Sequence, residues 1–126
     1  METFVWVVQI LLALAFFMAG IMKLTQPIDK LETRLSWIES INPRNMVRGI
    51  GLVEVLGALG LILPAVTGIL PVLTPLAAAG LVLTMLGAVS LHVRRGDAIA
   101  RAMPSVVLLA LAVFVAYGRF VAVPLA

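Results

Sequence analysis

The chain has 126 residues, of which 63% are hydrophobic and 12% are charged. A soluble domain carries about 25% charged residues, so this chain has too few to cover a water-soluble globule. It contains no cysteine, which excludes disulfides, thiolate nucleophiles and cysteine-ligated clusters in this chain. The net charge of +3 comes from residues at the ends of apolar runs, which indicates membrane orientation rather than nucleic-acid binding.

The first apolar run covers residues 4–24 and is long enough to cross a bilayer. Gln9 interrupts this run, and Lys23 lies at its end. A cleaved signal peptide is the alternative interpretation. The first five residues contain one Glu and no Lys or Arg, so the basic start that is typical of a signal peptide is missing. We therefore expect an uncleaved membrane-spanning helix.

A polar stretch follows over residues 25–46. Charged residues alternate there with four apolar residues at helical spacing, which are Ile28, Leu31, Leu35 and Ile38. Pro27 precedes this pattern and Asn42-Pro43 ends it, so the sequence predicts a short amphipathic helix. We expect this helix to connect the first two spans at the membrane interface, with Trp37 at the level of the lipid headgroups. A helix that docks a partner is the alternative.

The second predicted span covers residues 47–64 and contains Glu54. A short apolar link over residues 65–70 makes the next helix, residues 71–93, its antiparallel neighbour. Proline is common in the first turn of a helix, and Pro71 and Pro75 suit the start of this third span.

A basic loop leads to the fourth span, which is predicted over residues 104–123. The sequence therefore predicts an all-α, integral membrane four-helix bundle with a short amphipathic interfacial helix between its first two spans. We expect one transmembrane domain over residues 1–126.

The basic residues are distributed very unevenly about the four predicted spans. Only Arg119 lies near the side of the termini, whereas eight residues flank the first and third loops: Lys23, Lys30, Arg34, Arg44, Arg48, Arg94, Arg95 and Arg101. Cytoplasmic loops of membrane proteins carry the excess of Lys and Arg. We therefore expect a multi-pass protein of the cell membrane with loops 1 and 3 in the cytoplasm and both termini outside.

Charged residues inside apolar spans are the main candidates for function. Such a residue at the centre of a span costs about 2.5–3.5 kcal/mol on insertion scales, so it usually pairs or serves a function. We expect a ligand-binding or polar cluster around Glu54 that contains Lys23, Arg48 and His92. Small residues at helical spacing place these side chains on packed faces. Arg119 is expected near the outer face, without contact to Glu54.

Each candidate also has a purely structural interpretation. Lys23, Arg48 and Arg119 could extend their charges to the interface, and His92 could be an ordinary interface residue. The side chain of Glu54 is too short to reach water from its depth. A pair with Lys23 or Arg48 would explain Glu54 without any catalysis. The sequence predicts no catalytic residue and no metal site.

Several segments resemble the DoxX-like family of small four-helix membrane proteins. They are AGIMKL, RGIGLVEVLGALGLILP, LTPLAAAGL, MLGAVSLHVRRGD and AYGRF, and together they cover nearly the whole chain. The resemblance implies that Lys23, Glu54, His92 and Arg119 are the polar positions of the family. It also implies a link to membrane oxidoreductases, because some relatives are described as subunits that pass electrons to or from quinones. More distant relatives use cysteine pairs, and that chemistry does not transfer to a chain without cysteine.

Three functions follow from these observations. The first is an accessory protein, either a small subunit or an assembly partner of a quinone-linked membrane redox system, which is not catalytic alone. A quinone is then the implied cofactor, hydrogen-bonded to His92 or Glu54. The second is a non-enzymatic small transporter or a protein that binds lipid or a partner through the Glu54 cluster. The third is a structural role in which Glu54 fixes helix register. The expected partners are the lipid bilayer and either a membrane protein or a second copy, with no nucleic acid.

Overall fold

The computed structural model describes residues 1–35, 38 and 45–125, and its described part is all helical. The elements in chain order are α1 (Glu2–Thr25), α2 (Ile28–Arg34), α3 (Met46–Thr67), α4 (Leu73–Arg95), α5 (Ile99–Tyr117) and the π-helix η2 (Gly118–Ala122). The predicted all-α class and the short helix after the first span are confirmed. Trp37 lies outside the described residues.

Four of the helical segments are long and apolar enough to cross a membrane. They are α1, α3, α4 and the continuous segment formed by α5 and η2, with 22 to 24 residues each. At 1.5 Å per residue such helices are about 33–36 Å long, which matches a hydrocarbon core of about 30 Å. The protein is therefore a multi-pass membrane protein.

At two predicted boundaries a proline lies inside the helix instead of at its end or start. α3 continues past Pro64 to Thr67 and ends at Gly68, whose φ of 73° is left-handed. Much of the predicted link over residues 65–70 is thus helical. Pro75 lies in the first turn of α4, whereas Pro71 precedes that helix. The last span begins at Ile99, ahead of the prediction, and Pro104 lies inside it.

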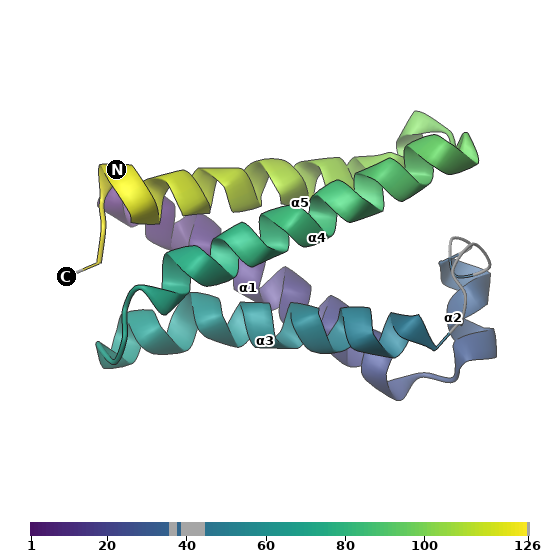
Figure 1. Ribbon diagram of the computed structural model, residues 1–126, viewed down its shortest axis with the longest axis horizontal. Coiled ribbons are helices and arrows are strands. Elements are labelled where there is room, and N and C mark those ends of the chain that lie inside the picture. Colours follow the sequence, from purple (N-terminus) through teal and green to yellow (C-terminus); the bar gives the residue numbers. More distant parts are fainter. Residues whose placement is uncertain (36–37, 39–44, 126) are drawn as a thin grey trace.

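The four long helices form two antiparallel pairs, α1 with α3 and α4 with α5 (Figure 1). The pairs lie close together at the end that carries both termini and the α3–α4 link, which we call the terminal end. They diverge toward the other end, which carries α2 and the α4–α5 turn. We call it the basic end, because the described Lys and Arg residues that flank the first and third loops gather there; Arg44 lies outside the described residues.

The core lies where these pairs meet. Side chains from all four long helices form one buried apolar cluster, which includes Leu12, Phe16, Leu61, Leu81 and Val115. A smaller cluster at the basic end holds α2 through Leu31, Ile38 and Val47. The amphipathic pattern of the polar stretch therefore packs α2 against the ends of its neighbours.

α1 and α3 make their closest approach at Gly20 and Gly51. A Cβ atom at Gly20 would lie 2.6 Å from the carbonyl oxygen of Gly51, and one at Gly51 would lie 2.8 Å from the carbonyl oxygen of Gly20. Only glycine allows two backbones to come this close. Lys23 and Glu54 each lie one helical turn beyond these glycines, so the close approach brings their side chains together.

Replacing Gly20 with alanine is expected to separate α1 from α3 and to destabilise the bundle by about 1–3 kcal/mol, as overpacking does. Gly49 is the matched control, because a Cβ atom there would meet nothing within 4 Å. Gly49→Ala should unfold like the wild type or slightly later. Helix content followed during denaturation in detergent measures both variants. Equal stability of Gly20→Ala and Gly49→Ala would contradict the close packing.

Candidate functional site

A buried ion pair joins α1 to α3 near the basic end. The Nζ atom of Lys23 lies 2.6 Å from Oε1 of Glu54, and their side chains are only 10% and 2% exposed. Arg48 lies next to this pair and donates from Nη1 to the main-chain oxygen of Lys23 at 2.8 Å. That carbonyl belongs to the last turn of α1, where helical acceptors have no partner within the helix. The structure thus brings Lys23, Arg48 and Glu54 together.

His92 does not join this group. Its Nδ1 atom lies 2.8 Å from Oδ2 of Asp97, the residue that follows the left-handed Gly96 in the α4–α5 turn. The reason lies in the fold, since α4 diverges from α1 and α3 toward the basic end (Figure 1). The expected four-residue cluster is therefore two separate groups, one around Glu54 and the other at the end of α4.

The Asp97 carboxylate has several positive neighbours. The hydrogen bond with His92 lowers the pKa of Asp97 below its ordinary value of 3.8, and the charges of Arg95 and Arg101 act in the same direction. Arg95 has its Nε atom 3.7 Å from Oδ2 of Asp97. A carboxylate in this setting stays ionised throughout the neutral range.

Replacing Asp97 with asparagine should therefore lower stability in a way that depends on pH. A carboxyl group whose pKa is depressed by folding stabilises the native state above its unfolded pKa. For Asp97 this contribution is complete well above pH 3.8 and is lost as the pH falls through the lower folded pKa. Unfolding in detergent at pH 7 should separate Asp97→Asn from the wild type, and the difference should shrink below pH 3.8. A difference that is constant over this range would contradict an ionised, stabilising Asp97.

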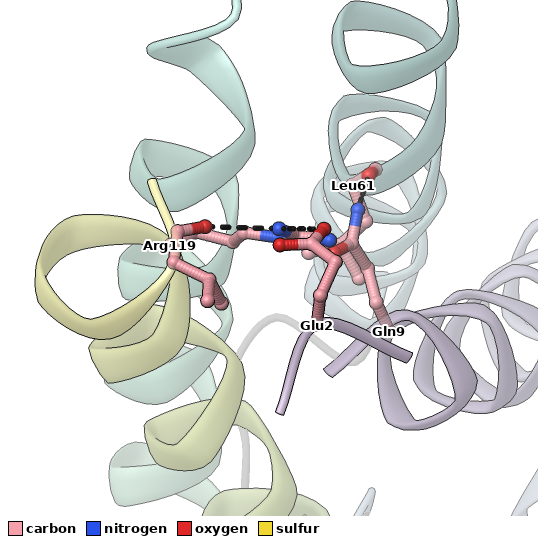
Figure 2. A network of polar contacts seen from close by, with 5 residues as sticks. Glu2, Gln9, Leu61 and Arg119 are labelled. Atoms are coloured by element: carbon pink, nitrogen blue, oxygen red, sulfur yellow. Dashed lines mark hydrogen bonds and ion pairs between the residues drawn. The ribbon is translucent and has the colours of Figure 1, made fainter. Parts of the chain in front are cut away.

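A second buried network occupies the terminal end, and Arg119 of η2 is its centre (Figure 2). The side chain of Arg119 is fully buried. Its Nε atom donates to Oε1 of Gln9 at 2.8 Å, and its Nη1 atom donates to Oε1 of Glu2 at 2.8 Å and to the Val123 carbonyl at 3.0 Å. The guanidinium also lies 5.0 Å from the centroid of the Trp6 ring, a cation–π contact.

Gln9 extends this network to a third element. Its amide nitrogen donates to the main-chain oxygen of Leu61 in α3, so a continuous line of hydrogen bonds runs from η2 through α1 to α3. The line reaches the protein surface at Glu2, whose side chain is 53% exposed. Arg119 is thus an internal residue that ties three elements together. Its contacts are with α1 and its own segment and not with Glu54, as the sequence predicted.

The π-helix places Arg119 on the inner side of the last span. The closing bond of η2 runs from the Val123 amide to the Gly118 carbonyl at 2.7 Å, which is one residue longer than an α-helical bond. Gly118 allows η2 to lie against α1, because a Cβ atom there would be 3.0 Å from the side chain of Val5. The wider turn and the close approach together direct the guanidinium toward Glu2 and Gln9.

Pro64 leaves one carbonyl of α3 without its usual donor, and a side chain of α4 replaces that donor. A proline has no N–H, so the carbonyl four residues earlier in the helix loses its usual donor. That carbonyl belongs to Gly60, and the hydroxyl of the buried Thr74 in α4 donates to it at 3.0 Å. Gln9 bonds to the neighbouring carbonyl of Leu61. The Thr74 hydroxyl thus replaces the donor that Pro64 removes from α3.

Several participants in these groups were not among the predicted site residues, including Glu2, Trp6, Gln9 and Asp97. Gln9 could have been found from the sequence, because it is the one polar residue that interrupts the first apolar run. No comparable signal marked the others. Among residues 1–35, 38 and 45–125, no three His, Asp or Glu side chains come together as a group that could hold a metal ion.

Four long apolar helices with charged side chains paired between them define a four-span integral membrane protein. The chain belongs to the DoxX-like family, whose model matches residues 7–115. Comparisons with curated proteins and with solved structures gave no match. Lys23, Glu54 and His92 lie inside the matched range, whereas Glu2 and Arg119 lie on either side of it.

Proposed function

We propose that this protein is an accessory subunit or assembly partner in a quinone-linked membrane redox system and is not catalytic alone. Membership of the DoxX-like family supports the membrane setting. The observation that carries the proposal is the unequal burial of the spans. The most apolar window of α1 is 39% buried within the chain, whereas that of α5 and η2 is only 11% buried. The last span thus offers a long apolar face to lipid or to a neighbouring membrane protein.

The test is copurification of the tagged chain from native membranes in a mild detergent. Mass spectrometry should identify a membrane protein partner, and the absorption spectrum should show a bound quinone or a haem of that partner. Recovery of the chain alone, with no absorbing group, would contradict the proposal.

A pair of matched variants tests whether the α5 face carries the contact. Val113 on α5 and Leu63 on α3 are similarly exposed, at 49% and 51%. Val113→Trp should reduce recovery of the partner, whereas Leu63→Trp should not. If both variants behave alike, the partner does not use α5.

We propose that the basic end faces the cytoplasm and that both termini lie outside, in accord with the excess of Lys and Arg at that end. Because the chain has no cysteine, single-cysteine variants report orientation without background. A cysteine in place of the exposed Ile69 should react with a membrane-impermeant thiol reagent added to intact cells, and one in place of the exposed Ala98 should not. The opposite labelling pattern would reverse the orientation.

A further inference from the structure

A pocket of about 290 Å³ lies at the basic end, between the start of α2 and the start of α3. It is lined by Pro27, Ile28, Asp29 and Arg48. Asp29 is exposed and Arg48 is half-buried, so a molecule outside the chain can reach both side chains. Pockets for drug-sized ligands have volumes of about 300–1,000 Å³, so this one suits a small polar group.

The pocket lies at the level where two membrane spans end. α1 ends at Thr25, just before Pro27, and Arg48 is in the first turn of α3. The apolar length of a spanning helix matches the hydrocarbon core, so its ends lie at the level of the lipid headgroups. The small polar group that a membrane offers to this pocket is therefore a phospholipid headgroup.

The two charged residues of the pocket are held in place by their surroundings. The Nη1 atom of Arg48 donates to the main-chain oxygen of Lys23 at 2.8 Å, which uses one of the five N–H donors of the guanidinium. Arg48 follows Val47 in the sequence, and Asp29 lies two residues before Leu31. Val47 and Leu31 are fully buried in one apolar cluster, which fixes α2 against α3. The pocket thus presents a positive and a negative group in a set arrangement.

We propose that this pocket binds the phosphoethanolamine headgroup of a membrane phospholipid, with its phosphate on Arg48 and its primary ammonium on Asp29. The guanidinium fork matches the geometry of phosphate oxygens. A carboxylate has about four acceptor sites, so Asp29 can accept from the ammonium in addition to its contacts within the chain. This site is independent of the proposed redox role.

Other common headgroups satisfy only half of this pocket. Phosphatidylglycerol offers a phosphate to Arg48 but no cation to Asp29, whose charge repels an anionic lipid. Phosphatidylcholine carries a quaternary ammonium, which has no N–H to donate to the carboxylate. The pair of opposite charges therefore favours a zwitterionic lipid with a primary ammonium over both.

Native mass spectrometry of the full-length protein in detergent tests this preference. Phosphatidylethanolamine, phosphatidylcholine and phosphatidylglycerol with identical acyl chains are added in turn, and the bound lipid is counted. One phosphatidylethanolamine should be retained with roughly two- to fivefold higher affinity than either other lipid, the scale of an exposed ion pair. Equal retention of phosphatidylethanolamine and phosphatidylcholine, or a preference for phosphatidylglycerol, would overturn the proposal.

Variants assign the two halves of the headgroup to their residues. Asp29→Asn should lower retention of phosphatidylethanolamine to that of phosphatidylcholine. Glu32→Gln is the matched control, because it removes the same charge from α2 at a residue that does not line the pocket. Arg48→Lys keeps the charge but not the fork, so it should weaken both zwitterionic lipids alike. Circular dichroism checks that each variant folds. A preference that survives Asp29→Asn would contradict the assignment of the ammonium.

A soluble compound with the same headgroup separates a membrane lipid from a free ligand. Glycerophosphoethanolamine has no acyl chains, so an equal concentration should leave the bound phosphatidylethanolamine in place. Its displacement would show that the pocket takes a soluble ligand and would overturn the assignment to a lipid. Because these assays use the isolated chain, their outcome does not depend on whether a redox partner is recovered.

Discussion

Replacing Lys23 with methionine is expected to destabilise the folded protein by about 3–5 kcal/mol, the usual cost of removing one member of a buried ion pair. The substitution leaves the Glu54 carboxylate, which is 2% exposed, without the Lys23 ammonium that pairs with it between α1 and α3. Denaturation of the purified protein in mixed micelles, followed by circular dichroism, measures the effect. Lys30→Met is the matched control, since Lys30 is exposed on α2 and should tolerate the change.

Two double variants determine what the pair contributes. Lys23→Met combined with Glu54→Leu should recover most of the lost stability, because it removes both charges and leaves none unpaired. The charge-swapped protein, Lys23→Glu with Glu54→Lys, should also be more stable than either single variant if the pair fixes the register of α1 against α3. If neither double variant improves on Lys23→Met, the contribution of Glu54 is not the ion pair.

Replacing Arg119 with methionine is expected to cost at least about 1–3 kcal/mol, the cost of leaving a buried acceptor without its donor. The acceptor left behind is Oε1 of Gln9 in the interior, whereas Glu2 is half-exposed and can turn to water. Adding Glu2→Gln to Arg119→Met should therefore cause little further loss. The same denaturation assay applies, with Arg94→Met as the control because Arg94 is exposed.

The Arg119→Lys variant tests whether stability requires only a positive charge at this position or the shape of the guanidinium group. The guanidinium bonds Gln9 through Nε and Glu2 through Nη1, which a single ammonium on a flexible chain does not reproduce. We expect Arg119→Lys to lose most of the stability that Arg119→Met loses. Wild-type stability in the lysine variant would show that a positive charge alone suffices there.

The sequence was sufficient to predict the four spans and the short helix between the first two, because both follow from apolar patterns that are local in the chain. It did not predict where α3 ends. The defect at Pro64 is repaired by Thr74, a residue of the next helix, and no local pattern reveals that bond. The spacing of apolar residues within one segment therefore cannot predict a helix end that depends on a bond from another helix.

For the candidate site, the sequence predicted how deep each residue lies along its helix but not which helices bring the residues into contact. Depth along each helix placed Glu54 near Lys23 and Arg48; in the structure Lys23 bonds to Glu54, and Arg48 bonds to the main chain of Lys23. The position of a residue along its helix does not give the angle between helices, so His92 was expected beside Glu54. Because α4 diverges from α1 and α3, His92 instead lies beside Asp97. Gln9 and Arg119 lie 110 positions apart, and a neutral amide carries no charge pattern that would link them.

The carbonyl that Pro64 leaves without a donor has a consequence for the order of assembly in the membrane. An unpaired carbonyl is costly in hydrocarbon, where no water can replace the missing N–H. α3 therefore enters the bilayer with one turn incomplete, and only the hydroxyl of Thr74, which is synthesised later, completes it. The second span, α3, thus has this carbonyl paired only once the start of the third span, α4, lies beside it.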